Sequence, residues 1–515
     1  MFPINLIRHE HPELFIAVVA PVGADVEIVC SSLSNALKSF DYSLEGIRVV
    51  EQLKQFPSVF LKDEPLEEDK KILGRMDAGD QFRATVARND ALALLAVSAV
   101  RKFRATKFRA THSSEEVPIP EDVPIRRQAY LFRSLKRPEE VTALRRIYAS
   151  NLIVLGIHSG REQRVQNLAE RIAKSRYSAH VQTFRNDAET LVIRDESDER
   201  KTYGQRLRSA FAMADIFLDA SDPQGARREL DRFLNLLFGK PVITPTPDEA
   251  GMAHAHIAAM RSAEMGKQVG AAICDPKGNL IAIGTNEVPK AYGGYHWDAE
   301  SPDNRDWSRG FDSSDHFKKS SLGELLQVLS SSGMLSDKLK GFSTPEQLRE
   351  VTPLLKQTRY MQLIEFVRAV HGEMSALMDA AARGVPVSGC TMYVTTFPCH
   401  ECARHIIAAG IARVVYIEPY AKSLALELHG DSIELDGPAT QSKVPFVPFL
   451  GIAPRNHSNI FAMPDRKDMD GNVIAWDPVK ANPRVSGSFW SYLPYEKEDL
   501  KILTEKLKSK GFELS

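Results

Sequence analysis

The hydrophobic pattern of the first half of the chain predicts an α/β fold. Leu14 to Ala20 form a short, wholly apolar run that is typical of a buried strand, and a turn at Pro21 to Asp25 follows it. Residues 26–40 then carry apolar side chains at helical spacing. A long helical pattern covers 77–100, and further strand candidates are 130–132, 152–157 and 214–218. Strands that alternate with helices predict a mostly parallel sheet.

The second half of the chain follows a different order. A proline-rich stretch at 240–249 marks the boundary, and the insertion 291–355 interrupts the pattern behind it. The expected strands are 269–274, 280–284, 391–395, 413–417 and 444–449, and the expected helices are 251–266, one beginning at His371, 399–409 and 422–428. Beyond 455 there is little pattern before an amphipathic helix near 496–510. We therefore expect two domains, 1–245 and 246–515, the second with an insertion and a C-terminal extension.

Composition excludes several classes of protein. With 43% hydrophobic and 26% charged residues, the chain is neither disordered nor of low complexity. A net charge of -1 argues against a chain-wide nucleic-acid-binding surface. Five cysteines are too few for a disulfide scaffold. Neither a secretion signal nor an apolar run of membrane-spanning length is visible, so we expect a cytoplasmic protein without a membrane partner.

One segment carries a short tandem repeat, KFRATKFRAT, followed by an acidic, proline-rich stretch. We interpret 101–126 as an exposed loop or linker inside the first domain. Its alternating basic and phenylalanine residues could contact RNA through phosphates and base stacking. The alternative, which we favour, is a solvated loop with two anchoring phenylalanines.

The strongest chemical signal is His371-Gly372-Glu373 followed by Pro398-Cys399-His400-Glu401-Cys402. This spacing matches the H-x-E and P-C-x-x-C signature of zinc deaminases. One imidazole and two thiolates give Zn²⁺ three protein ligands, and the fourth position of a catalytic zinc site takes water. Both metal-binding segments are expected at helix N-termini, which favour thiolates.

Glu373 lies two residues after the histidine ligand, so it can reach the activated water without binding zinc. In that position it would take a proton from the water, pass it to the ring nitrogen and assist the departure of ammonia. The alternative is a structural zinc site or a chance spacing. A structural site usually has four protein ligands, whereas the sequence offers three and a candidate base.

The stretch from Met252 to Arg455 resembles the deoxycytidylate deaminase family, within the cytidine deaminase-like α/β/α fold. The resemblance rests on Ser262, residues 267–271, Gly284-Thr285-Asn286, Pro289 and Gly293-Gly294. It implies that Asn286 hydrogen-bonds the sugar; as a turn residue, Asn286 would need no such role. It also implies substrate contacts for Lys267 and Tyr420. Ser375 stands where the family often has asparagine, which alters recognition of the sugar or phosphate.

Most of the chain resembles the antiviral cytidine deaminases of bacteria, which join a P-loop-like domain to a deoxycytidylate deaminase domain, and the resemblance is specific in the C-terminal half. Supporting segments include Ser134 to Val141, Gly204-Gln205, Thr396 to Cys402 and Glu418-Pro419-Tyr420. The resemblance implies deamination of dCTP and dCMP, which depletes the dCTP that phage replication needs. It further implies a homo-oligomer, and restraint by a small RNA or a nucleotide.

The strand, turn and helix of 14–40 are placed like a P-loop, so the first domain is expected to be P-loop-like and nucleotide-kinase-like. The phosphate-gripping G-K-[ST] ending is missing, however. Pro21, Gly23, Ala24 and Asp25 are candidate nucleotide-binding residues, and backbone N–H groups of this turn could hold an anion. We expect a degenerate domain used for assembly or sensing. Arg194-Asp195 and Asp215 are either polar site residues or members of surface ion pairs.

Two rival functions stay open at this stage. The same zinc chemistry could serve an enzyme that edits a cytosine or adenine base in nucleic acid, although the near-neutral charge speaks against it. The chain could also be a non-catalytic nucleotide sensor or scaffold, although Glu373 argues against that reading.

Overall fold

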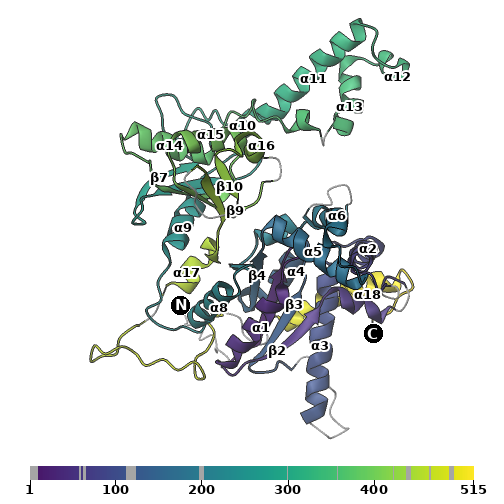
Figure 1. The fold of residues 1–515 in the computed structure, drawn as a ribbon, viewed down its shortest axis with the longest axis vertical. Coiled ribbons are helices and arrows are strands. Elements are labelled where there is room, and N and C mark those ends of the chain that lie inside the picture. The colour runs from purple at the N-terminus through teal and green to yellow at the C-terminus, as the bar shows by residue number, and fades with distance from the viewer. Residues whose placement is uncertain are drawn as a thin grey trace. The chain divides into compact units, whose positions relative to one another are not determined.

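The computed structural model divides the chain into two units, 1–245 together with 450–515, and 246–449 (Figure 1). The residues described are 10–56, 59–61, 65–111, 123–196, 202–298, 300–355, 358–420, 423–435, 442–462, 465–485 and 492–514. Each unit is built around its own sheet, and the boundary between Pro245 and Thr246 lies in the proline-rich stretch.

The first unit contains a sheet whose order, among the described residues, is β12-β5-β4-β1-β3-β2. Its strands are β1 (Leu14–Val19), β2 (Ser43–Arg48), β3 (Gln128–Arg133), β4 (Leu152–His158), β5 (Ile216–Asp219) and β12 (Gly451–Ile452). Strands β1 to β5 pair in parallel, and β12 pairs antiparallel with β5. The predicted parallel sheet is therefore present, with β1 at its centre.

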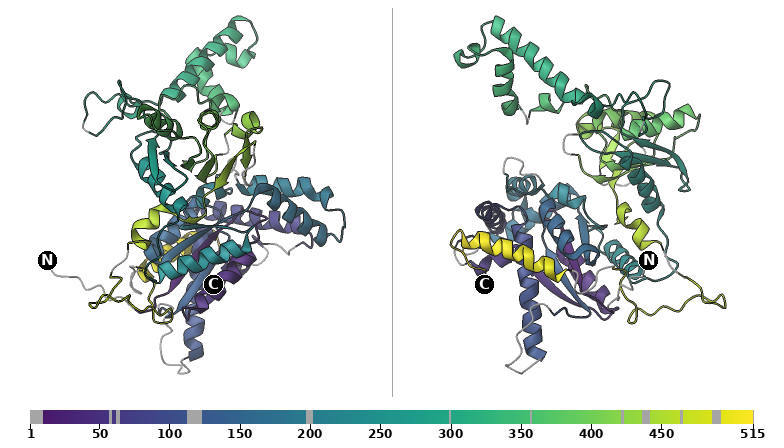
Figure 2. Two further views of the ribbon diagram at one scale, coloured as in Figure 1. Left: turned by 60° about the vertical axis from the view of Figure 1, so that its left-hand side comes forward. Right: turned by 180° about the vertical axis from the view of Figure 1, so that it is seen from behind.

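Helices cover both faces of this sheet (Figure 2). They are α1 (Val26–Lys38), α2 (Glu68–Val86), α3 (Ala91–Thr111), α4 (Pro138–Tyr148), α5 (Arg161–Ser175), α6 (Arg185–Glu196), α7 (Leu207–Phe211), α8 (Pro223–Leu237), α17 (His457–Ile460) and α18 (Leu493–Lys508). Leu14, Ile16 and Val18 join the core that α1 and α8 complete. Phe15 points to the opposite face and stacks on Tyr148 of α4, with 3.6 Å between ring centroids. The alternation explains why all of β1 is buried.

The expected single helix over 77–100 is interrupted, and the first part of the expected loop over 101–126 is helical as far as Thr111. The chain forms two helices, α2 and α3, separated at Ala87, whose φ of +51° ends α2 in the left-handed conformation. Helix α3 then continues through the tandem repeat to Thr111. The rest of the expected linker, 112–122, lies outside the described residues.

Burial of Arg104 explains why the repeat is helical. Its guanidinium is fully buried between the carboxylates of Glu13 and Glu496, with shortest distances of 2.8 and 2.7 Å. Tyr492 also donates a hydrogen bond of 2.6 Å to Glu13. A buried charge requires such compensation, and the helix is what places this arginine in the interior.

The C-terminal residues belong to the first unit, and not to the second as the sequence suggested. Strand β12 extends the first sheet, and α18 packs against α2, α3 and α4 (Figure 2). Asp215 connects the same parts: it accepts hydrogen bonds from Arg145, Arg455 and Asn456. Asp215 therefore belongs to ion pairs, but these are buried and not at the surface as the second alternative expected.

The second unit contains a mixed sheet of order β10-β11-β9-β8-β6-β7. Its strands are β6 (Gly270–Cys274), β7 (Leu280–Thr285), β8 (Thr391–Thr396), β9 (Arg413–Glu418), β10 (Ile433–Leu435) and β11 (Val444–Pro448). Its helices are α9 (Pro247–Met260), α10 (Asp306–Arg309), α11 (Ser313–Ser331), α12 (Asp337–Lys340), α13 (Thr344–Leu355), α14 (Gly372–Ala382), α15 (His400–Ala408) and α16 (Ala425–His429). Apart from the short strand β10 and the inserted helices, this is the order that the sequence predicted.

The insertion forms helices of its own. Helices α11 and α13 pack against each other around Leu322, Leu326 and Leu335, which form a small separate core. Along the part of the chain that the structure describes, no helix is long and apolar enough to cross a membrane.

Candidate metal centre

The metal-binding segments lie at the N-termini of two helices on the second sheet. His371 precedes the first residue of α14, and Cys399 precedes the first residue of α15, which follows β8. Helix α14 lies very close to β7 because Gly284 has no side chain: a Cβ there would come within 2.1 Å of the Gly372 carbonyl oxygen. This close packing fixes His371 beside the end of β8.

The three predicted ligands are together. The Nδ1 atom of His371 lies 3.3 Å from the Sγ atoms of both Cys399 and Cys402. All three ligand atoms lie within 4.8 Å of one another. Both cysteines are buried, and the backbone N–H of Cys402 donates to the Cys399 sulfur at 3.4 Å. One nitrogen and two sulfur donors, arranged around one point, fit a zinc site that keeps a fourth position.

Electrostatics also favour a cation at this point. The hydrogen bond with Cys402 lowers the pKa of Cys399, and the same interaction together with burial raises the pKa of Cys402. The two sulfurs thus share one negative charge, because two adjacent buried thiolates repel each other. A divalent cation removes this conflict and allows both sulfurs to ionise.

Glu373 lies in the first turn of α14 and is only 3% exposed. Burial, and then the negative charge of Cys399, raise the pKa of this carboxyl to about 7. A carboxyl group with a pKa near neutrality can both accept and donate a proton at physiological pH. Its carboxyl interacts with Cys402, and its role as the proton-transferring base stays a prediction.

Ser375 is held by a residue that the sequence did not single out. Its hydroxyl oxygen lies 2.7 Å from that of Tyr295, in the loop after β7. The guanidinium of Arg261 lies between two rings of this loop, 3.8 Å from the centroid of Tyr295 and 4.0 Å from that of Trp297. Such cation–π pairs stiffen an otherwise exposed loop. The adjacent Gly293-Gly294 was the available sequence signal for a loop here.

Asn286, which is buried, and Lys267, which is exposed, both bind other residues of this chain. The Asn286 amide accepts from the backbone N–H of Val269 and donates to the carbonyl of Lys267, both at 2.7 Å. Lys267 forms an ion pair with Glu418 at the end of β9. Asn286 therefore connects two loop segments, as the turn interpretation expects. A sugar contact by Asn286 and a substrate contact by Lys267 stay predictions.

Two further side chains lie near the ligands. Tyr420 packs against the core cluster that includes Cys399 and Cys402, and burial, then the charge of Cys399, raise the pKa of its hydroxyl. The carboxylate of Glu264, in the segment after α9, acts electrostatically on His371. The sequence pointed to Tyr420 but not to Glu264, which stands outside both signature segments.

The other predicted residues lie in the first unit. Pro21, Gly23, Ala24 and Asp25 line a separate cavity there. Asp195 also lines that cavity, whereas Arg194 pairs with Asp77 at 2.6 Å. The structure therefore separates the residues expected to bind a nucleotide in the first domain from the metal centre.

Comparison with known families agrees with this geometry. Residues 245–418 match the family described as the cytidine and deoxycytidylate deaminase zinc-binding region. The second unit carries a deaminase domain with a zinc site. His371, Cys399 and Cys402 are its zinc ligands. The domain has the cytidine deaminase-like fold that the sequence predicted, and the first unit is an α/β domain.

Individual relatives match only short parts of the chain. ComE operon protein 2 of Bacillus subtilis is 42% identical over 72 residues, which are 13% of this chain and 38% of that protein. Deoxycytidylate deaminase of Enterobacteria phage T2 is 44% identical over 54 residues, 10% of this chain and 29% of the relative. The chain thus spans well under two thirds of these relatives. The dCMP deaminase from cyanophage S-TIM5 in apo form is 16% identical and covers 40% of this chain and 100% of its own, with a TM-score of 0.22.

Proposed function

We propose that the deaminase domain hydrolyses the C4 amino group of a cytosine deoxynucleotide, dCMP or dCTP, to give the uracil nucleotide and ammonia. The observation that carries the proposal is the buried carboxyl of Glu373 beside the three zinc ligands. The match to a relative named deoxycytidylate deaminase supports this substrate class.

The zinc ligands and Glu373 have different roles in the proposed reaction. His371, Cys399 and Cys402 would hold zinc, which supplies Lewis acidity and makes water nucleophilic near neutral pH. Glu373 takes a proton from the attacking water and delivers it to N3 of the ring. It then takes the second proton from the new C4 hydroxyl and delivers it to the amino group, so that the C4–N bond breaks, ammonia leaves and the C4–O bond becomes a carbonyl. Tyr420 and the loop around Tyr295 would enclose the substrate.

A panel of cytosine compounds tests the substrate. The zinc-loaded full chain is incubated with dCMP, dCTP, CMP, CTP, deoxycytidine and single-stranded DNA and RNA, and uracil products are measured by chromatography. We expect turnover of dCMP or dCTP and none of the polymers. Turnover confined to polymer would contradict the proposal and favour an editing enzyme. Nucleotide binding without any product would favour a sensor.

The resemblance to bacterial antiviral deaminases extends the proposal to the cell. If dCTP is a substrate, expression of the active protein should lower cellular dCTP and reduce phage yield, and the Glu373→Gln variant should do neither. A homo-oligomer and restraint by a small RNA or a nucleotide stay predictions. Light scattering of the purified chain tests the first, and assays with co-purified RNA removed test the second.

A further inference from the structure

The first unit contains a cavity of about 770 Å³. It is lined by the segments that follow β1, β2 and β3, together with parts of α2 and α5. In open α/β sheets, ligands bind outside the carboxyl ends of the parallel strands. The volume falls within the range of small-molecule sites.

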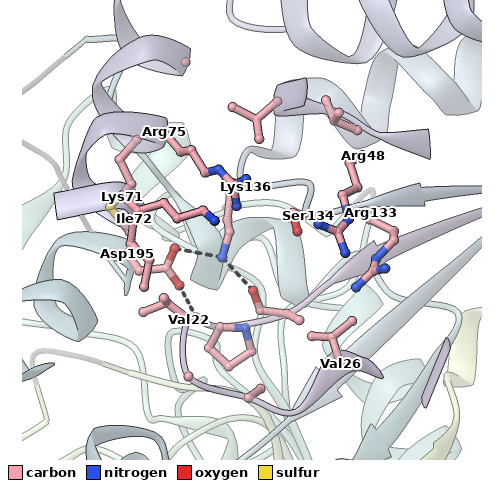
Figure 3. A pocket seen from close by; sticks show the side chains of 18 of the residues that line it. Val22, Val26, Arg48, Lys71, Ile72, Arg75, Arg133, Ser134, Lys136 and Asp195 are labelled. Atoms are coloured by element: carbon pink, nitrogen blue, oxygen red, sulfur yellow. Dashed lines mark hydrogen bonds and ion pairs between the residues drawn. The ribbon is translucent and has the colours of Figure 1, made fainter. Parts of the chain in front are cut away.

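Basic side chains from separate elements converge on this cavity. Arg48 ends β2, Arg133 ends β3, Lys136 follows β3, and Lys71 and Arg75 project from α2 (Figure 3). In Figure 3, Lys71 and Arg75 point toward Lys136. A cluster of this kind, assembled from distant parts of the sequence, suits the recognition of a phosphate group.

The backbone N–H groups of the loop after β1 are not arranged to bind phosphate as those of a phosphate-binding loop are. The buried Asp195 carboxylate accepts the Val22 N–H at 2.7 Å, so this donor is already used. Lys136 lies against the same group, 2.8 Å from Asp195, and donates to the Ala20 carbonyl at 2.7 Å. Gly23 is also confined, since a Cβ there would come within 2.6 Å of the Arg164 carbonyl. The N–H groups of Ala24 and Val26 also donate to carbonyl oxygens within this turn, so side chains are the main groups left to hold an anion.

The carboxylate of Glu27 marks a position in the cavity where two arginines bind a negative charge. One oxygen of Glu27 lies 2.5 Å from Arg133 and 3.4 Å from Arg48. The hydrogen bond from Arg133 lowers the pKa of Glu27. Glu51 forms a similar ion pair with Arg75. Glu27 is largely exposed, so it can turn to solvent and leave both guanidiniums to a stronger anion.

The remaining lining suits an uncharged ring system. Val22, Val26, Ile72 and Met76 supply apolar contacts beside the basic groups. Ser134, at the end of β3, adopts a φ of +73°, which is strained for a serine and typical of ligand sites. We propose that this cavity binds a phosphorylated small molecule of nucleotide size, with its phosphate held by Arg133, Arg48 and Arg75 instead of by the loop after β1.

Calorimetric titration of the zinc-loaded full chain tests the proposal independently of deamination. The probes are pyrophosphate, AMP, ATP and GTP, which lack the cytosine ring that the deaminase domain would take. We expect at least one nucleotide to bind more tightly than pyrophosphate. The Arg133→Ala variant should weaken that binding about tenfold or more, whereas Arg228→Ala, at an exposed arginine of the same unit outside the cavity, should leave it unchanged.

A second variant keeps the test informative if Arg133→Ala fails to fold. Glu27→Gln removes the competing charge and should tighten nucleotide binding, by about threefold or more. Binding that neither variant alters would overturn the proposal, as would the absence of binding across the panel. A nucleotide that binds no more tightly than pyrophosphate would overturn the assignment to a ligand of nucleotide size.

Discussion

The hydroxyl oxygens of Ser375 and Tyr295 lie 2.7 Å apart, although 80 residues separate the two side chains in the sequence. The contact connects the loop after β7 to the first turn of α14, which also carries Glu373. The loop is thereby held beside the candidate catalytic carboxyl.

Removing the Tyr295 hydroxyl should therefore weaken substrate binding more than it slows the reaction. For Tyr295→Phe we expect KM to rise about two- to tenfold, the usual effect of one lost hydrogen bond, with kcat nearly unchanged. Steady-state kinetics measure both constants. Tyr292→Phe, at an exposed tyrosine of the same loop, is the control. Equal KM values for the two variants would refute a positioning role.

Glu373 gives the most direct test of the chemistry. Glu373→Gln preserves the size of the side chain and removes the proton-transferring group, so uracil formation should fall by about 100-fold or more. Zinc content, measured by atomic emission, should stay at the level of the unmodified chain. An active variant would eliminate Glu373 as the base.

The cysteine ligands should control metal content. Cys402→Ser replaces a buried thiolate by a hydroxyl that binds zinc poorly, so zinc and activity should be lost together. Cys390→Ser alters a buried cysteine that is not part of the metal cluster, and should retain both. Dialysis against a chelator should abolish activity, and added zinc should restore it. Full zinc content in Cys402→Ser would be inconsistent with the ligand set.

Arg104 should govern the stability of the first unit. Arg104→Ala leaves Glu13 and Glu496 buried without their counter-ion, which costs about 3–5 kcal/mol. The thermal transition of the first unit should shift to a much lower temperature in calorimetry. Lys107→Ala, on an exposed turn of the same helix, should change it little. Similar shifts for the two variants would mean that the buried charges are not the source of stability.

The metal centre was predictable because its residues form two pairs, and the members of each pair are close together in the sequence. Cys399 and Cys402 are three residues apart at the start of a helix, and His371 and Glu373 are two apart at the start of another. Each pair has a fixed geometry once its helix forms, and the strand order brings the helices together. The contact of Tyr295 with Ser375 joins a loop to a distant helix, and no local pattern predicts it.

The fold was predictable where hydrophobic periodicity decides it, as in β1 and β8. The repeat around Arg104 was misread because a charged residue normally indicates a surface. Only the partners Glu13 and Glu496, from opposite ends of the chain, make its burial tolerable. For the same reason the sequence did not show that residues 450–515 complete the first unit.

That arrangement makes the deaminase domain an insertion within the first unit. During translation, residues 246–449 are made before β12 and Glu496. Until then the N-terminal part of the first unit is incomplete, and Arg104 lacks one of its two carboxylate partners. The first unit can therefore complete its fold only after the deaminase domain has been translated. A chain that ends before residue 450 would contain the zinc ligands in its deaminase domain, but its first unit would lack β12 and α18.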